Sequence, residues 1–247
     1  MTMRIGVFGR GRLGSLIGAA VSRSDDLDLC WAVGREGEPT ADVEVAIDVS
    51  HADAVPAHLA WAQGTGTDLV LGVTGWPVSD LDALGPTPAM GVLLAPNFSL
   101  SVALLRRLAT VLGGYAVQAP EPVDLAVCET HHRAKVDSPS GTALMLRSAL
   151  AGASGRDEHE VATTSLRLGN VVGEHTVRYE SAAESIELTH TSHTREVYAT
   201  GALAAARWLH GRPGIHTVDD WAHDQLEHLF ATPSRPLQPS TPHPVTL

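Results

Sequence analysis

Short runs rich in Val, Ile and Leu alternate with helix-forming stretches in the first part of the chain. The predicted strands are 3–8, 27–33, 43–49, 68–73 and 91–95, and the predicted helices between them are 13–22 and 52–63. Such continuously apolar runs are typical of parallel strands that are buried on both faces. Their alternation with helices predicts a doubly wound parallel sheet with right-handed crossover connections.

The pattern changes beyond residue 99. An amphipathic helix is predicted at 101–112, a strand at 123–129, a second helix at 140–150, and then polar–apolar alternation at 164–168, 175–181 and 185–191. Strict alternation predicts an open sheet with one face in water. Helices follow at 198–209 and 219–230. The predicted fold class is therefore α/β, with an N-terminal doubly wound parallel sheet and a central α+β domain built on an open mixed sheet.

Composition limits the classes of partner. The formal net charge of −11 argues against a nucleic-acid partner, because a binder must neutralise phosphates with clustered Lys and Arg. No apolar run approaches the ~20 residues that cross a bilayer, and the first strand begins too early to leave room for a signal peptide. We therefore expect a cytoplasmic protein with no membrane partner, in which Cys30 and Cys128 are free thiols. Residues 232–247, with five prolines and no apolar periodicity, are predicted to form a disordered tail.

A glycine-rich turn joins the first predicted strand to the first predicted helix. It reads Gly9-Arg10-Gly11-Arg12-Leu13-Gly14, which is a G-x-G-x-x-G pattern. In that position glycines permit a tight turn and let the backbone approach a pyrophosphate, while the helix N-terminus supplies amide donors. The pattern alone is weak, but its place in a strand–turn–helix unit makes it specific. It predicts a Rossmann-type dinucleotide-binding domain.

The end of the second strand indicates which nicotinamide cofactor is bound. An acidic residue there binds the ribose of NAD, whereas Arg accommodates the 2′-phosphate of NADP. The chain has Val33-Gly34-Arg35 at this place, so the carboxylate is missing and a cation is present. This pattern favours NADPH, with NADH as the alternative; the structural alternative is that Arg35 is a solvated loop residue.

Two further loops follow predicted parallel strands. They read Gly72-Val73-Thr74-Gly75 and Ala95-Pro96-Asn97-Phe98. Loops at the carboxyl ends of parallel strands line the ligand crevice of such folds. By themselves these segments are ordinary turns.

The densest group of reactive side chains lies between residues 129 and 142. The segment reads Glu129-Thr130-His131-His132-Arg133-Ala134-Lys135-Val136-Asp137-Ser138-Pro139-Ser140-Gly141-Thr142. Imidazole can deliver a proton near neutral pH, and the ammonium of the chain's single lysine can stabilise negative charge. The Ser-Gly-Thr amides at a helix start can bind a carboxylate. No metal is expected, because the adjacent histidines lack a third ligand at regular spacing.

Residues 129–143 match every fixed position of the signature E-x-H-H-x-x-K-x-D-x-P-S-G-T-A. The chain thereby resembles the 4-hydroxy-tetrahydrodipicolinate reductase (dihydrodipicolinate reductase) family of the bacterial diaminopimelate–lysine pathway. The resemblance extends to the glycine turn and to segments 72–75, 97–99, 172–176, 188–190 and 200–202. It covers nearly the whole chain apart from the proline-rich tail.

The resemblance implies both an organisation and a set of roles. Residues 1–98 plus 196–231 would form the dinucleotide-binding domain and residues 99–195 the substrate-binding and oligomerisation domain of a homotetramer. NADPH or NADH would reduce a cyclic imine dicarboxylate, with His131 as proton donor and Lys135 acting beside it. His132 and the Ser140-Gly141-Thr142 amides would bind carboxylates. The cofactor would contact residues 9–13, Arg35, residues 72–74 and residues 95–98.

The chain departs from the family pattern at several places. Phe8 stands where the first glycine of the turn is usual, and the segment between Arg35 and Asp48 is shorter than in many members. Two alternatives therefore stay open, a paralogous reductase of another cyclic imine and a non-catalytic NADP-binding sensor. Retention of His131 and Lys135 argues against the sensor, and retention of the whole segment 131–142 favours the dicarboxylate substrate.

Overall fold

The computed structural model describes residues 2–85 and 87–230 and contains two sheets. The first sheet has six strands in the order β10-β5-β4-β3-β1-β2, and all of its neighbouring strands are parallel. Its strands are β1 (Met3–Phe8), β2 (Leu27–Val33), β3 (Val45–Asp48), β4 (Asp68–Leu71), β5 (Gly91–Leu94) and β10 (Gly214–Thr217). This arrangement confirms the predicted doubly wound parallel sheet.

Helices cover both faces of the parallel sheet. Helices α1 (Arg12–Val21) and α5 (Glu196–Leu209) pack on one face, and α2 (Val55–Thr65) packs on the other with the short helices η1 (Ala52–Ala54) and η2 (Val78–Leu84). Successive residues of one strand serve opposite cores: Val45 and Ile47 face α1 and α5, whereas Ala46 faces α2. Burial on both faces explains why these strands are apolar throughout.

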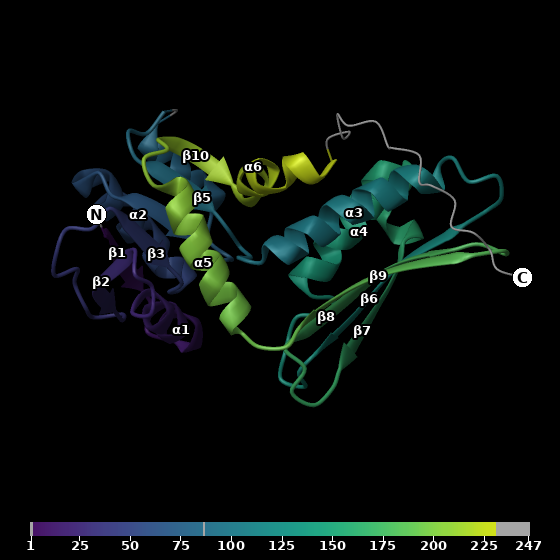
Figure 1. Ribbon diagram of the computed structural model, residues 1–247, viewed down its shortest axis with the longest axis horizontal. Helices are drawn as coiled ribbons and strands as arrows, with labels where there is room; N and C mark the ends of the chain where they lie inside the picture. The colour runs from purple at the N-terminus through teal and green to yellow at the C-terminus, as the bar shows by residue number, and fades with distance from the viewer. Residues whose placement is uncertain (1, 86, 231–247) are drawn as a thin grey trace, which may run out of the picture.

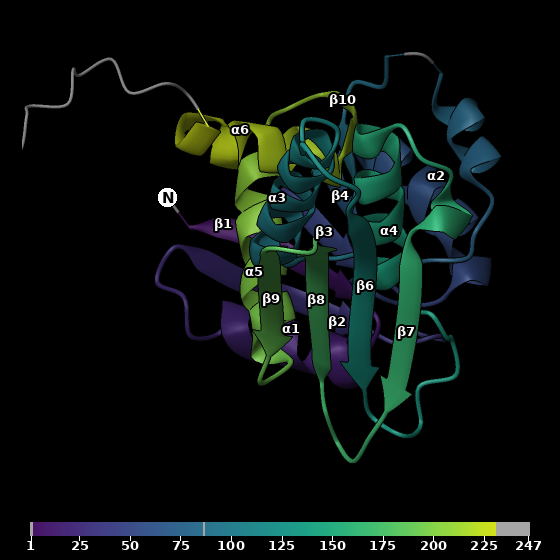
Figure 2. The same cartoon turned by 90° about the vertical axis from the view of Figure 1, so that its right-hand side faces the viewer.

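The second sheet has four strands in the order β7-β6-β8-β9. They are β6 (Asp124–His131), β7 (Ala162–Arg167), β8 (Gly173–Glu180) and β9 (Ser185–Ser192), and the β6–β7 pair is parallel while the other two pairs are antiparallel. Helices α3 (Leu100–Ala116) and α4 (Gly141–Ser154) cover one face, with η3 (Glu158–Glu160) after α4. Figure 2 shows the four strands with both helices behind them and the opposite face uncovered. The predicted open mixed sheet is thus confirmed.

Each sheet forms a lobe with the helices that cover it, and the C-terminal part of the chain joins the two lobes. Helix α6 (Val218–Phe230) runs from β10 toward α3 (Figure 1), where Arg106 of α3 pairs with Asp219. Next to this pair, Arg107 and His223 approach to 3.3 Å between Nη2 and Nδ1. The side-chain amide of Asn97 lies 3.5 Å from the Thr142 hydroxyl, which links the end of the parallel sheet to the start of α4. These contacts place the ends of both sheets beside one cleft.

Several elements of the structure differ from the sequence predictions. Strand β10 was not predicted, because its four residues include one large apolar side chain and lie at a sheet edge. Helix α3 continues to Ala116, beyond the predicted end at 112, because Leu112 and Ala116 remain buried on its inner face. Strand β3 is shorter than the predicted 43–49. The proline-rich tail lies outside the described residues, and the limits of the two domains remain a prediction.

Two smaller expectations concern thiols and membranes. Cys30 on β2 and Cys128 on β6 are both free and half-buried. Within the described ranges, no helix combines the length and apolar character that are needed to cross a bilayer.

Candidate active site

The glycine turn between β1 and α1 is built for close backbone contact. Gly9 has a φ of +110°, and a Cβ there would lie 2.7 Å from the Val49 carbonyl oxygen. A Cβ on Gly14 would lie 1.9 Å from the Gly9 carbonyl oxygen, so both positions require glycine. Gly11 precedes α1 without a side-chain cap, and the first turn of α1 holds no acidic residue. The first amides of α1 are therefore available to an anion.

A cavity of about 550 Å³ opens beside this turn. Its lining includes Gly9, Arg10 and Gly11 of the turn together with Arg35 and His51. The Arg35 Nε–H donates to His51 Nε2 at 3.3 Å. Gly34 leaves the end of β2 without a carboxylate. The charged residues that line the cavity are Arg10, Arg35, Glu38 and Asp53.

A second cavity, of about 620 Å³, lies between the two lobes. The parallel-sheet lobe contributes Leu13 of α1 and residues from the loops after β4 and β5, namely Gly72, Thr74, Pro96, Asn97 and Phe98. The other lobe contributes His131, His132, Lys135, Ser140, Gly141 and Thr142. The cleft therefore brings the predicted cofactor loops opposite the predicted catalytic segment.

Three of the predicted cofactor residues line neither cavity. Arg12 is exposed on the first turn of α1. Val73 follows β4 and is buried in the core beneath α2, and Ala95 follows β5 and is buried in the core beneath α1 and α5. Their side chains are therefore packing groups in this structure.

The face of β6 that packs on the helices changes from apolar to polar at the cleft. Leu125 and Val127 are core residues, and Glu129 and His131 follow them on the same face. Strand register places Glu129 opposite His175 of β8, and His175 opposite His190 of β9. A row of polar side chains thus crosses the sheet where it meets the cavity.

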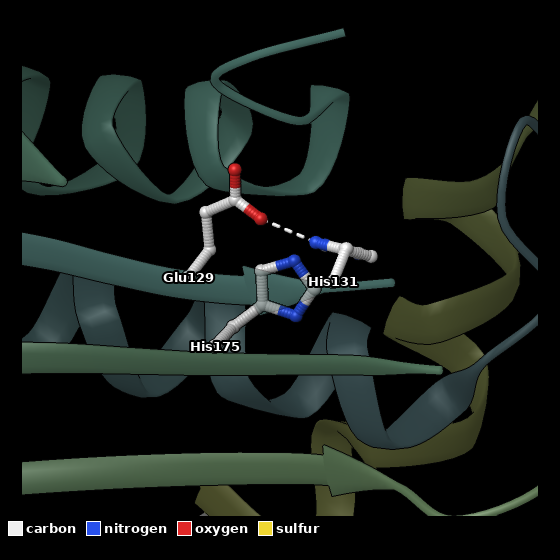
Figure 3. A group of neighbouring side chains, drawn as sticks. All are labelled: Glu129, His131 and His175. Carbon is white, nitrogen blue, oxygen red and sulfur yellow. Dashed lines mark hydrogen bonds and ion pairs between the residues drawn. The ribbon is translucent and has the colours of Figure 1, made fainter. Parts of the chain in front are cut away.

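Glu129 is the centre of this polar group. Its side chain is 0% exposed, and Oε1 accepts from Arg167 Nη2 at 2.9 Å and from the Ser140 amide at 3.2 Å. Its Oε2 bonds to His131 Nδ1 (Figure 3). Burial alone would raise the pKa of Glu129, but the hydrogen bonds that it accepts, that from Arg167 foremost, outweigh burial and lower the pKa to about 2. Glu129 is therefore ionised at neutral pH.

His131 and His175 lie edge to face beside this carboxylate. Their ring centroids are 5.0 Å apart with an interplanar angle of 73°. Burial lowers the pKa of His131, although the contact with Glu129 acts in the opposite direction. Burial and the neighbouring His131 lower the pKa of His175 to about 4, so His175 is neutral at pH 7. His175 Nε2 lies 3.3 Å from the Ser140 hydroxyl.

Lys135 reaches the cleft from the loop after β6. Its Nζ lies 2.8 Å from Asp137 Oδ1, and this contact lowers the pKa of the Asp137 carboxyl. The Lys135 side chain is 23% exposed, so its charge is partly withdrawn from water. Arg167 Nε donates to the Lys135 carbonyl oxygen at 3.3 Å, and Arg167 Nη2 donates to that of Asp137. The loop is therefore anchored to β7.

The start of α4 is held by Ser140. Ser140 is the N-cap, and its hydroxyl accepts from the Ala143 amide at 3.2 Å. The Ser140 amide donates to Glu129 at 3.2 Å, and its predicted contact with a substrate carboxylate stays a prediction. Gly141 and Thr142 are the more exposed members of the turn and line the cleft.

Glu129, His131 and His175 also have the side-chain types of a metal site. Their potential ligand atoms lie within 4.8 Å of one another, so His131 has neighbours that the sequence did not reveal. Both Glu129 oxygens already hold hydrogen bonds, one of them from a guanidinium that would repel a cation. This arrangement favours proton handling, and the absence of a metal stays a prediction.

Sequence reasoning missed several residues of the cleft. His175, His190, Ser192, Arg195 and Tyr198 line it, and Glu129 and Arg167 support it. The signal for Glu129 was its spacing two residues before His131, which places both side chains on one face of a strand. The others come from β7, β8, β9 and the start of α5, so their proximity depended on strand order.

Comparisons with known proteins agree with this architecture. The family described as "Dihydrodipicolinate reductase, N-terminus" matches residues 38–98, and "Dihydrodipicolinate reductase, C-terminus" matches residues 99–221. The 4-hydroxy-tetrahydrodipicolinate reductase of Gluconobacter oxydans is 38% identical over 245 residues, which cover 88% of this chain and 96% of the relative. That of Gluconacetobacter diazotrophicus is 35% identical over 249 residues, with the same two coverages.

A solved structure shares the fold. The dipicolinate-bound dihydrodipicolinate reductase of Paenisporosarcina sp. TG-14 superposes with a TM-score of 0.73 at 17% identity, over 88% of this chain and 98% of that one. Two matching family segments, relatives of nearly equal length and a shared fold confirm the resemblance stated from the sequence. The chain therefore belongs to the dihydrodipicolinate reductase family.

Proposed function

We propose that this chain uses a nicotinamide cofactor to reduce the cyclic imine 4-hydroxy-tetrahydrodipicolinate to tetrahydrodipicolinate, within diaminopimelate and lysine biosynthesis. The observation that carries the proposal is the cleft of about 620 Å³, which has cofactor-type loops on one wall and His131, His132 and Lys135 on the other. Relatives that match this chain over most of their length are named 4-hydroxy-tetrahydrodipicolinate reductase.

The parallel-sheet lobe fits a dinucleotide. A Cβ on Gly11 would have no atom within 4 Å, so open space lies where a pyrophosphate would meet the first amides of α1. Arg10 and Arg35 would hold the adenosine end, and the loops of Gly72, Thr74 and Asn97 would hold the nicotinamide end. When bound, the cofactor supplies the hydride. Arg12, Val73 and Ala95 would act through their backbone.

The other wall supplies the proton and the charge. Conversion of 4-hydroxy-tetrahydrodipicolinate to tetrahydrodipicolinate takes up one hydride and one proton and releases the 4-hydroxyl group as water, and His131 lies in the cleft to donate that proton. Lys135 would act beside His131 by stabilising negative charge on the substrate, and His132, Gly141 and Thr142 would bind the carboxylates. Ser140 would act by orienting the start of α4, since its hydroxyl and amide are engaged.

A substrate panel tests this assignment against a paralogue that reduces another cyclic imine. The proposal predicts that removing one of the two ring carboxylates lowers kcat/KM by at least about tenfold, because the polar groups of the cleft that would bind it then lose their partner. Equal or better use of a cyclic imine with one carboxylate would favour the paralogue. NADPH binding without turnover of either compound would favour the sensor.

We predict that the protein prefers NADPH to NADH, and that Arg35→Ala weakens NADPH binding by about 10- to 100-fold. Arg35 offers its charge to the 2′-phosphate, while NADH has no phosphate there to lose. Dissociation constants of both cofactors are measured at fixed salt for the variant and the wild type. Arg23→Ala, an exposed arginine after α1, is the control. An equal loss for both cofactors, or a wild-type preference for NADH, contradicts the prediction.

The pH profile should separate the free enzyme from the complex. His131 must be protonated to donate, and burial lowers its pKa below 6.5 in the free protein. The value of kcat/KM should therefore fall as pH rises through a point below 6.5. A bound dianion stabilises the imidazolium, so the corresponding fall in kcat should occur at higher pH. Coincident limbs in the two profiles would show that the substrate charge does not act on His131.

Assembly remains a prediction. We expect a homotetramer, and the uncovered face of the second sheet offers a surface for contacts between subunits (Figure 2). The partner in catalysis is a small dicarboxylate, in keeping with the cationic and amide groups of the cleft.

A further inference from the structure

We propose that Glu129, held in place by Arg167, is a positioning residue that fixes the orientation and the proton-bearing nitrogen of His131. Neither residue is assigned a role by the proposed function, on which this inference rests through His131. The bond network in the second sheet carries it.

Glu129 fixes His131 through one oxygen and the surrounding scaffold through the other. Oε2 accepts from His131 Nδ1, while Oε1 accepts from Arg167 at 2.9 Å and from the Ser140 amide at 3.2 Å. All of these partners are backbone or side chains of β6, β7 and the start of α4. The carboxylate therefore cannot turn without breaking bonds to three elements.

This geometry selects the ring nitrogen that exchanges the proton. An ionised carboxylate only accepts, so Nδ1 carries a hydrogen in both protonation states of His131. The transferred proton then belongs to Nε2, for which the described residues provide no hydrogen-bond partner. A Cβ on Gly173 would lie 3.1 Å from Nε2, so the glycine at the start of β8 leaves that nitrogen uncovered.

Arg167 connects the proton donor with the lysine loop. Besides Glu129, its guanidinium donates to the backbone carbonyls of Lys135 and Asp137. One side chain on β7 thus holds the support of His131 and the segment that presents Lys135. A planar fork with several donors suits this role, and an ammonium does not.

A purely stabilising role explains these charges poorly. Leu125 and Val127 precede Glu129 on the same face of β6 and are apolar core residues. An apolar side chain at position 129 would likewise have no charge to desolvate. Buried ion pairs contribute little net stability compared with well-packed apolar replacements. The charges that act most strongly on His131 are Glu129, Lys135 and Arg167, with the neutral His175 ring beside them, and His132, Asp137 and His190 also line the cleft. Of the two carboxylates, Glu129 bonds to the His131 ring, whereas Asp137 pairs with Lys135.

The test is Glu129→Gln. Its amide oxygen can keep the bonds from Arg167 and Ser140, but its NH₂ then faces His131 Nδ1 and requires that nitrogen to accept. We expect kcat to fall by about 100-fold or more. We also expect its alkaline limb to move down by about one pH unit, because the nearby negative charge is lost. Nitrogen-15 NMR of the histidines should show the His131 proton moved from Nδ1 to Nε2, with NADPH affinity nearly unchanged. The Tm should fall, because Arg167 keeps its charge without a carboxylate partner.

Two further variants complete the design. Glu158→Gln removes the carboxylate of an exposed pair with Arg147, 2.7 Å apart, and should leave every measurement unchanged. Arg167→Lys keeps the positive charge but not the fork, and we expect an intermediate loss of kcat with part of His131 shifted to the other tautomer. It serves as the second test if Glu129→Gln does not fold.

The outcomes separate the two proposals. The positioning role is overturned if the wild-type protein turns over the imine and Glu129→Gln shows the same kcat and the same alkaline limb of the kcat pH profile. So does a loss of kcat with an unmoved limb and an unmoved tautomer, which is what a merely structural role produces. Failure of the wild-type protein to turn over the imine instead overturns the proposed function.

Discussion

Replacement of His131 by Ala is expected to lower kcat by about two to four orders of magnitude, the usual contribution of a positioned general acid. The imidazole lies in the cleft, with Nδ1 on Glu129 and Nε2 free to exchange a proton. None of the residues of segment 129–142 lines the cavity beside the glycine turn, which Arg10 and Arg35 line. NADPH affinity should therefore remain within about twofold of wild type, since the loss falls on the chemical step.

Steady-state kinetics beside a direct NADPH titration checks this result. His159→Ala provides the control, because His159 is an exposed histidine on η3. If His131→Ala retains near-normal turnover, the imidazole is a structural group of the cleft and the proton comes from elsewhere.

Lys135→Arg is expected to be almost as damaging as Lys135→Ala. Lys135 is the single lysine of a chain with sixteen arginines, so arginine serves at every other cationic position. Its ammonium lies 2.8 Å from Asp137 Oδ1, and the Lys135 side chain is only 23% exposed. A planar guanidinium is larger and cannot reproduce a compact point charge there. We expect both substitutions to reduce kcat/KM by about 100-fold or more.

The reverse exchange in the same loop is the control. Arg133 is exposed, and Arg133→Lys should leave kcat/KM unchanged. Retention of full turnover by Lys135→Arg would show that any cation suffices at position 135.

The parallel sheet could be predicted because the signals for its strands and for the glycine turn lie within short contiguous segments. Strands such as 3–8 and 27–33 are apolar throughout, and the glycine turn between the first strand and helix marks the nucleotide side. Strand β10 could not be predicted, since four half-exposed residues at an edge carry almost no periodic signal. Helix α3 is longer than predicted because its last turn remains buried against α4 and β6, beyond the stretch with clear amphipathic spacing.

The candidate site was predictable to the extent that it is contiguous. His131, Lys135 and Thr142 lie in one segment, and the structure brings them to one cleft. The partners of Glu129 could not be predicted in the same way. Arg167 and His175 reach it only through the order and register of β7, β6 and β8. Register depends on pairing between distant segments, which local patterns do not specify.

The most direct test of the proposed reductase activity follows NADPH oxidation spectrophotometrically with freshly generated 4-hydroxy-tetrahydrodipicolinate. We predict rapid oxidation by the wild-type chain, with one NADPH consumed for each tetrahydrodipicolinate formed. We also predict that the rate collapses in His131→Ala. NADPH that binds to the wild-type chain but is not oxidised in the presence of this substrate would contradict the proposed activity.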